Sequence, residues 1–134
     1  LVGKFLCTKY AIPLLKKSKS SAIVNISSKL GIKPCGEASS YCASAAAIIN
    51  FTKASAIELS KYNIRVNSVC PGFVPTPLSL KGWTKEEIED KEKTNPLKRL
   101  GSTLDVSNAV LFLLSDEASY INSENINVNG GSLL

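Results

Sequence analysis

Residues 22–28 read Ala-Ile-Val-Asn-Ile-Ser-Ser, a short apolar and β-branched run that ends in two serines. A run of this length and composition predicts a buried strand over residues 22–27. Before it, residues 2–17 place apolar side chains near helical spacing and predict a helix, which Pro13 should bend or shorten. The small polar residues between the two predict a loop, so the chain opens as helix, loop and strand.

A long helix and a second strand follow. Residues 40–61 have helical periodicity, with Ser39 or Ser40 as the expected N-cap. The side chains expected to face the core are Tyr41, Ile48, Ile49, Thr52, Ala56 and Leu59. Residues 64–69, Ile-Arg-Val-Asn-Ser-Val, alternate between apolar and polar side chains and predict a strand.

An irregular segment and a charged helix come next. Residues 70–77 contain three prolines and a glycine, so we expect them to be irregular throughout. A short helix is expected over residues 85–93, with Thr84 as its cap and acidic side chains in its first turns, where the helix dipole favours them.

The last helix and strand complete an alternating pattern. A helix capped by Thr103 is expected to end near Leu114, with a core face of Val106, Ala109, Val110 and Leu113. Residues 125–128 predict the final strand. Strands that alternate with long helices indicate an α/β fold, in which a parallel sheet is flanked by helices. Three strands make a narrow sheet of this kind, so we expect further strands outside this chain.

Composition limits the chemistry. The 134 residues, 44% hydrophobic and 20% charged, suit one globular domain, and the absence of methionine leads us to expect a fragment or a processed product. No histidine is present, which removes the Ser-His-Asp triad and most zinc chemistry. Cys7, Cys35, Cys42 and Cys70 form no Cys-x-x-Cys pair. We therefore expect no metal site, four reduced thiols and a cytoplasmic protein.

Charge and hydropathy argue against two kinds of partner. The net charge of +5 comes mainly from lysines spread along the chain, which indicates a solvated surface rather than a nucleic-acid site. No apolar run approaches the ~18 residues that a membrane span requires. We expect neither a nucleic acid nor a membrane as partner.

Three features are expected to meet at one edge of the sheet. The first strand ends at Ser28, Tyr41 follows Ser28 by thirteen residues, and a Pro-Gly loop over residues 71–76 follows the second strand. Ligands of parallel α/β sheets bind outside the carboxyl ends of the strands. We therefore expect Ser28, Tyr41 and Thr76 to converge on one cleft.

Four motifs occur along the chain in a familiar order, namely Asn25-Ile-Ser-Ser28, Tyr41-Cys-Ala-Ser44, Ile64-Arg-Val-Asn67 and Pro71-Gly-x-Val-x-Thr76. With a last strand that leads to Gly-Gly, they make essentially all of the chain resemble the C-terminal half of a short-chain dehydrogenase/reductase. The resemblance implies a partial doubly wound, Rossmann-type parallel sheet with flanking helices. Residues 1–134 would be the C-terminal portion of a single NAD(P)-binding domain, and residues 78–96 would be a substrate lid.

The resemblance also implies roles for individual residues. Ser28 would hydrogen-bond the oxygen of an alcohol or carbonyl substrate, and Tyr41 would give or take its proton. The contacts to the cofactor, NAD or NADP, would come from Tyr41, Pro71, Gly72, Val74 and Thr76. Asn25 and Asn67 would be structural and would tie strand ends to neighbouring loops.

The sequence departs from the family at two important places. The family motif Tyr-x-x-x-Lys ends here in Ala45, where a lysine would stabilise the tyrosinate and hold the cofactor ribose. Neither Lys29 nor Lys53 is expected to replace it. The glycine-rich phosphate-binding loop has no match, so no cofactor is expected to bind this chain alone. The smaller departures, at positions where the family often has Gly and Asp, are Ser123 and Asn129.

Two functions are compatible with these departures. The chain is an oxidoreductase by ancestry that is inactive as it stands, or it is a non-catalytic remnant that serves as a binding or subunit-association module. The family commonly forms homo-oligomers through its long helices, here residues 2–17 and 40–61. Within the lid, Leu80 and Trp83 either line the substrate pocket or anchor the lid helix.

Overall fold

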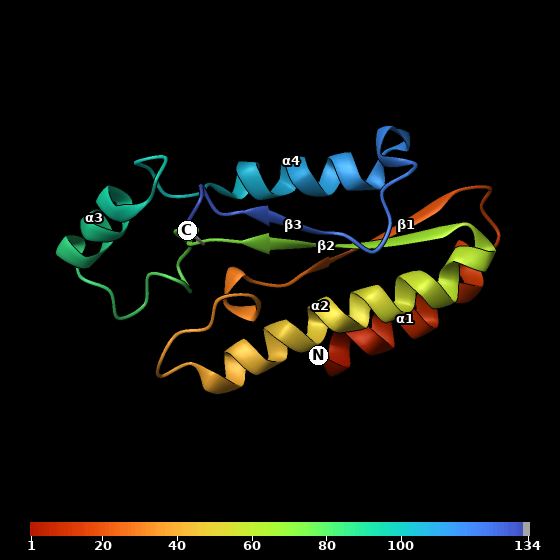
Figure 1. The fold of residues 1–134 in the computed structure, drawn as a ribbon, viewed down its shortest axis with the longest axis horizontal. Helices are drawn as coiled ribbons and strands as arrows, with labels where there is room; N and C mark the ends of the chain where they lie inside the picture. The colour runs from red at the N-terminus through yellow and green to blue at the C-terminus, as the bar shows by residue number, and fades with distance from the viewer. Residues whose placement is uncertain (133–134) are drawn as a thin grey trace.

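A computed structural model describes residues 1–132. Its helices are α1 (Val2–Leu15), α2 (Ser39–Leu59), α3 (Lys85–Thr94) and α4 (Thr103–Leu114), and its strands are β1 (Ser21–Ile26), β2 (Ile64–Pro71) and β3 (Asn125–Val128). Short 3-10 turns are η1 (Lys29–Gly31), η2 (Ser60–Tyr62) and η3 (Asp116–Ala118). The strands form the middle of three layers, with α1 and α2 on one face, α4 on the other, and α3 beyond the carboxyl ends of the strands (Figure 1).

The sheet is parallel, with the strand order β1-β2-β3. Ser21 pairs with Ile64 at the start of the β1–β2 ladder, and Ser68 pairs with Asn125 at the start of the β2–β3 ladder. The central strand β2 is buried from its first residue to its seventh. This arrangement confirms the predicted α/β class with a parallel sheet and flanking helices.

Alternation along β2 divides the core between the two helical layers. Ile64 and Val66 pack with Ala56 and Leu59 of α2, and the half-buried side chains Ile12, Leu15 and Ile23 pack against them. On the opposite face Val69 packs with Leu113 and Ala118, and the four residues predicted as the core face of α4 contribute to this cluster. Because successive side chains of a strand point to opposite faces, β2 packs against the helices on both faces of the sheet.

The end of β2 differs from the sequence prediction. We expected residues 70–77 to be irregular throughout, but β2 continues through Cys70 to Pro71, which pairs with Val128. Proline is tolerated here because it stands at the last position of the strand, and the Gly72 N–H continues the ladder to the Val128 carbonyl at 2.9 Å.

The helix caps also differ in part. Thr84 caps α3 as predicted, in a reciprocal capping box with Glu87. The cap of α4 is Ser102 rather than Thr103, because the Ser102 hydroxyl accepts the Asp105 N–H while the Asp105 carboxylate accepts the Ser102 N–H. The predicted serine caps of α2 are wrong, since this helix starts after Ala38 without a side-chain cap.

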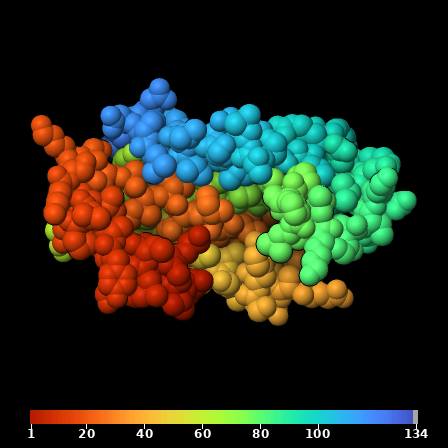
Figure 2. Space-filling view, turned by 180° about the vertical axis from the view of Figure 1, so that it is seen from behind, coloured from red at the N-terminus to blue at the C-terminus, as the bar shows by residue number. Residues whose placement is uncertain are grey.

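The outer edge of β1 is open. Within residues 1–132, β1 pairs with β2 and with no other strand. Figure 2 shows the β1 side of the sheet, in orange, exposed between α1, in red, and α4, in blue. A cavity of about 430 Å³ lies beside this edge, between α1 and β1, and its lining includes Cys7, Thr8 and Val24.

Candidate functional site

Ser28 lies at the carboxyl end of β1 and is buried. Its hydroxyl oxygen accepts the Leu30 N–H at 3.2 Å, so Ser28 is the N-cap of η1. This bond uses the oxygen as an acceptor and leaves the hydroxyl proton available to donate. A substrate oxygen needs such a donor.

Tyr41 lies in the first turn of α2 and is 55% exposed, so its predicted place on the core face is wrong. Ala45, one turn later on the same side of the helix, is only 4% exposed. The turn η1 causes the difference, because it covers the second turn of α2. A methyl group on Gly31 would lie 2.7 Å from the carbonyl carbon of Ala45, and the Ser27 hydroxyl donates to the Ala45 carbonyl oxygen at 2.8 Å.

The loop after β2 is held by its neighbours. A methyl group on Gly72 would lie 2.9 Å from the Cα of Asn129, which leaves no room for a side chain. Val74 and Thr76 are fixed by Ser79, whose hydroxyl donates to the Val74 carbonyl at 2.6 Å and whose N–H donates to the Thr76 hydroxyl at 3.2 Å. The predicted cofactor loop is therefore a rigid turn at the same edge of the sheet as Ser28 and the start of α2 (Figure 1).

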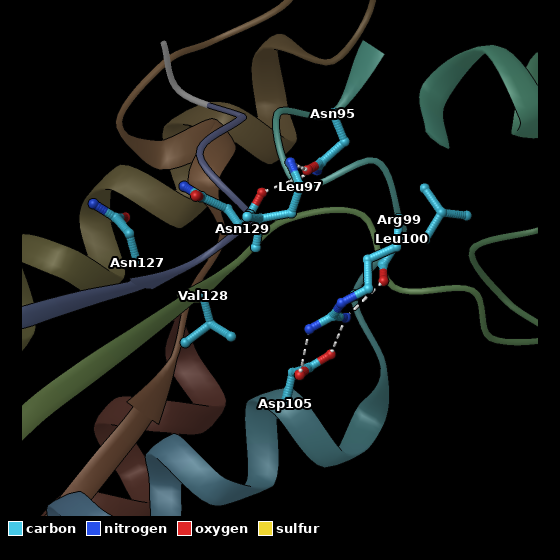
Figure 3. Close-up of a pocket in the computed structure, with 10 residues that line it drawn as sticks. Asn95, Leu97, Arg99, Leu100, Asp105, Asn127, Val128 and Asn129 are labelled. Carbon is cyan, nitrogen blue, oxygen red and sulfur yellow. Dashed lines mark hydrogen bonds and ion pairs between the residues drawn. The ribbon is translucent and has the colours of Figure 1, made fainter. Parts of the chain in front are cut away.

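The segment predicted as a lid is anchored at both ends. The ring of Trp83 packs on Phe73 with 5.2 Å between the ring centroids, which favours the anchoring role of Trp83. At the other end, the Asn95 amide donates to the Asn129 carbonyl at 3.2 Å. Figure 3 shows Asn95 and Asn129 side by side at the rim of a cavity of about 180 Å³, across from the ion pair of Arg99 and Asp105.

The two asparagines predicted to be structural make buried or half-buried hydrogen bonds. Asn67 follows the prediction, because its amide donates to the Ile121 carbonyl at 2.8 Å and accepts the Glu124 N–H at 2.9 Å. Asn25 differs, because its amide donates to the Thr52 hydroxyl of α2 at 3.0 Å rather than to a loop.

Two groups near this edge, the Lys29 ammonium and the Cys70 thiol, have shifted pKa values. Burial lowers the pKa of Lys29, and the nearby ammonium groups of Lys91 and Lys33 lower it further, whereas Cys35 acts in the opposite direction. Burial raises the pKa of the Cys70 thiol, although hydrogen bonds with Ser68 and Ser27 oppose the shift. Cys70 is therefore a neutral thiol and no nucleophile.

Sequence reasoning missed one group of residues. The ammonium of Lys29 donates to the Ser132 hydroxyl at 3.0 Å, and Lys91 of α3 and Phe73 line the same cavity. Periodicity and motif spacing carry no signal for this group, since its members come from separate segments. In this arrangement the Lys29 ammonium contacts Ser132, 103 positions further along the chain.

The residues present suit one end of a dinucleotide. Phe73 of the rigid loop over residues 71–76 lines the same small cavity as Lys29, the residue after Ser28, and this loop has the place of one that lies against a flat ring. Within residues 1–132, however, no helix begins in a glycine-rich turn of the kind that cradles a pyrophosphate. No group of three or more His, Cys, Asp or Glu side chains in this range could hold a metal ion. None of the helices described has both the length and the apolar character needed to cross a bilayer.

Comparison with known proteins places these observations in a family. The family described as enoyl-(acyl carrier protein) reductase matches residues 1–132. A 2,5-dichloro-2,5-cyclohexadiene-1,4-diol dehydrogenase of Sphingobium indicum is 39% identical over 127 residues, which are 95% of this chain and 50% of that protein. A 3-oxoacyl-[acyl-carrier-protein] reductase of Aquifex aeolicus is 43% identical over 132 residues, 98% of this chain and 52% of that protein.

Solved structures agree with the sequence matches. Levodione reductase superimposes with a TM-score of 0.91 at 32% identity, over 98% of this chain and 54% of that one. A 7α-hydroxysteroid dehydrogenase complexed with NADH and 7-oxo-glycochenodeoxycholic acid gives a TM-score of 0.90 at 31% identity. The match covers 95% of this chain and 50% of that one. The chain spans about half the length of the curated relatives that it matches. With its fold, its motifs and these matches taken together, the chain belongs to the short-chain dehydrogenase/reductase family.

Proposed function

We propose that the complete protein is an NAD(P)-dependent oxidoreductase that acts on an alcohol or carbonyl group of a small molecule. Residues 1–134 would be the C-terminal portion of its single Rossmann-fold domain, with residues 78–96 as the substrate lid. The observation that carries the proposal is the shared location of three family motifs. Ser28, the start of α2 with Tyr41, and the loop over residues 71–76 all lie at the carboxyl edge of a parallel sheet (Figure 1).

Each residue has a distinct task in this proposal. Ser28, whose hydroxyl proton is available, donates a hydrogen bond to the substrate oxygen. Tyr41 gives a proton to that oxygen during reduction and takes it during oxidation. The residues that lie against the cofactor are Tyr41, Pro71, Gly72, Val74 and Thr76. When bound, the nicotinamide supplies or accepts the hydride.

Ala45 argues for low activity of this chain. A lysine at this position would bring a positive charge and a hydrogen-bond donor to the face of α2 that carries Tyr41. Ala45 brings neither, and its backbone is already fixed by Ser27 and Gly31. The second candidate function, a non-catalytic binding or subunit-association module, is favoured by this substitution.

The long helices supply a surface for association. The outward side chains Val2, Tyr10 and Leu14 of α1 are 70%, 70% and 69% exposed, and Ile57 of α2 is 75% exposed. Exposed apolar side chains that gather into a contiguous patch mark interaction surfaces. We therefore propose a homo-oligomer through α1 and α2. The four free thiols support a cytoplasmic location.

A chimaera tests the oxidoreductase proposal. The N-terminal half of the Aquifex aeolicus reductase would be joined to this chain, with Ala45→Lys added so that activity can be measured. We expect NADH- or NADPH-dependent reduction of small ketones that falls at least about 10²-fold in Tyr41→Phe and in Ser28→Ala. Tyr120→Phe, at a fully exposed tyrosine, is the matched control. Unchanged rates in Tyr41→Phe would overturn the assignment of the proton donor.

Calorimetry tests the cofactor half of the proposal. This chain alone is expected to bind neither NAD(H) nor NADP(H) with a dissociation constant tighter than about 100 μM, roughly −5.5 kcal/mol. The physical reason is the lack of a phosphate cradle in the described residues. The chimaera, which has one, is the positive control.

A further inference from the structure

A small basic cavity lies beside the proposed site. Its volume is about 180 Å³, and it lies where η1, the loop after β2 and the end of α3 come together. Within the described part of the chain, its lining includes Lys29, Phe73, Lys91 and Ser132, and no aspartate or glutamate. A whole small-molecule ligand commonly needs ~300 Å³ or more. This cavity has room for one functional group rather than for a complete substrate or a dinucleotide.

Among residues 1–132, no carboxylate pairs with the two lysines of this cavity. Within residues 1–132 the side chains that form ion pairs are those of Glu89 with Lys93 and Asp105 with Arg99, so neither Lys29 nor Lys91 is paired there. Burial and the Lys91 ammonium both lower the pKa of Lys29, which shows that its positive charge is disfavoured in this place. An anion held between the two ammonium groups would remove that penalty.

The remaining contacts set the geometry of the cavity. Lys29 donates to the Ser132 hydroxyl at 3.0 Å, and the Ser132 hydroxyl keeps a proton that it can donate in turn. Lys91 is held over the Trp83 ring at 4.6 Å from the ring centroid, and Trp83 is packed on Phe73. The ammonium groups and the hydroxyl therefore come from three separate parts of the chain that the fold fixes in place.

We propose that this cavity binds an oxyanion group, a carboxylate or a phosphate, carried by the substrate. The substrate part of the proposal rests on the proposed function, because Lys29 directly follows Ser28 and Phe73 belongs to the loop over residues 71–76. The oxidoreductase would then act on an acidic or phosphorylated alcohol or ketone. Its charged end would lie between Lys29 and Lys91, and its reacting carbon would lie towards Ser28.

The only tryptophan of the chain reports on this cavity, because Trp83 touches Lys91. The emission of Trp83 in the whole chain would be titrated with sodium phosphate and with sodium acetate, at constant ionic strength set with chloride. We expect a saturable change whose apparent dissociation constant weakens at least about 10-fold in Lys29→Gln, a loss of roughly 1.4 kcal/mol. A tighter response to acetate would identify an acidic substrate, and a tighter response to phosphate a phosphorylated one.

Lys93→Gln is the matched control, since Lys93 lies on the same helix and pairs with Glu89 at the surface. Lys29→Arg keeps the charge and is expected to keep most of the binding, which covers the case in which Lys29→Gln unfolds. Absence of a saturable response, or an equal loss in Lys93→Gln, would overturn the proposal. The titration involves no dinucleotide and no turnover, so its outcome is independent of whether the chimaera reduces ketones.

Discussion

The Ser27 hydroxyl donates to the Ala45 carbonyl oxygen at 2.8 Å and so joins the residue after β1 to the second turn of α2. The residue where the family has its lysine is therefore fixed by the residue just before the proposed substrate-binding serine. Gly31 reinforces this contact, because a larger residue there would collide with the same helical turn.

Removal of the Ser27 hydroxyl is expected to weaken this junction. Ser27→Ala should lower the free energy of unfolding by about 1 kcal/mol, the usual net value of one hydrogen bond. Urea denaturation followed by circular dichroism would measure it. Ser107→Ala removes an exposed hydroxyl that bonds only within its own helix, to the Leu104 carbonyl, and serves as the control. An equal loss in the two variants would mean that the junction contributes nothing specific.

The steady-state rates of the chimaera with and without Ala45→Lys measure how much catalytic rate is lost when the motif lysine is missing. A positioned acid or base typically contributes ~10² to 10⁴-fold, so we expect the variant to be faster by at least about 10²-fold near neutral pH. Oxidation should gain more than reduction, because a protonated tyrosine can still donate. Ala45→Met adds bulk without charge at this 4%-exposed position and should remain slow. Rates that agree within about threefold, under ~1 kcal/mol, would show that Ala45 is compatible with catalysis.

Ser123 occupies a backbone conformation that suits glycine. Its φ is 69°, and its N–H donates to the Val66 carbonyl at 3.0 Å, a bond that glycine would keep. Ser123→Gly should relieve the strain of the left-handed conformation but should cost the extra entropy that glycine loses on folding. The balance should raise the free energy of unfolding by about 0.5 kcal/mol. Ser119→Gly, at a φ of −58°, should lower it instead. Thermal or urea unfolding would compare the two, and a loss in both would contradict the strain at Ser123.

Asp105 should make a pH-dependent contribution to stability. The Arg99 guanidinium, at 2.7 and 3.0 Å, and the hydrogen bonds from Ser102 hold the pKa of this carboxyl well below its usual range. A carboxyl whose pKa is lower in the folded than in the unfolded state stabilises the fold fully at pH values above its unfolded pKa, about 4. This stabilisation is lost as the pH falls towards the pKa of the folded state. The difference in Tm between the wild-type chain and Asp105→Asn should be largest near neutrality and shrink below about pH 4. Glu89→Gln, at a surface pair, should show little difference at any pH.

The sequence allowed the elements and their order to be predicted, because periodicity reports directly on burial. The strand at residues 22–27, the long helix after it and the core face of α4 all follow from the spacing of apolar side chains. The predicted burial of Tyr41 was wrong for a specific reason. The helical pattern cannot show that η1 covers the second turn of α2 and leaves the first turn exposed.

The site could be predicted only where motifs fix it. Ser28, Tyr41 and the loop over residues 71–76 follow from motif order, and their roles remain predictions. The cavity between Lys29 and Lys91 could not be predicted, because Lys29 meets Ser132 across 103 positions of the chain. Such contacts depend on how loops fold back over the sheet, and local spacing does not encode them.

The open edge of β1 has a consequence for how this molecule can be used. A strand with unpaired N–H and C=O groups along one side is a template for another strand. The cavity of about 430 Å³ beside it, between α1 and β1, offers apolar contact to whatever docks there. The chain is thus suited to join, by strand addition, a separately expressed N-terminal half of the proposed oxidoreductase. With Ala45→Lys added, hydride transfer by the proposed oxidoreductase would then report on the meeting of the two halves.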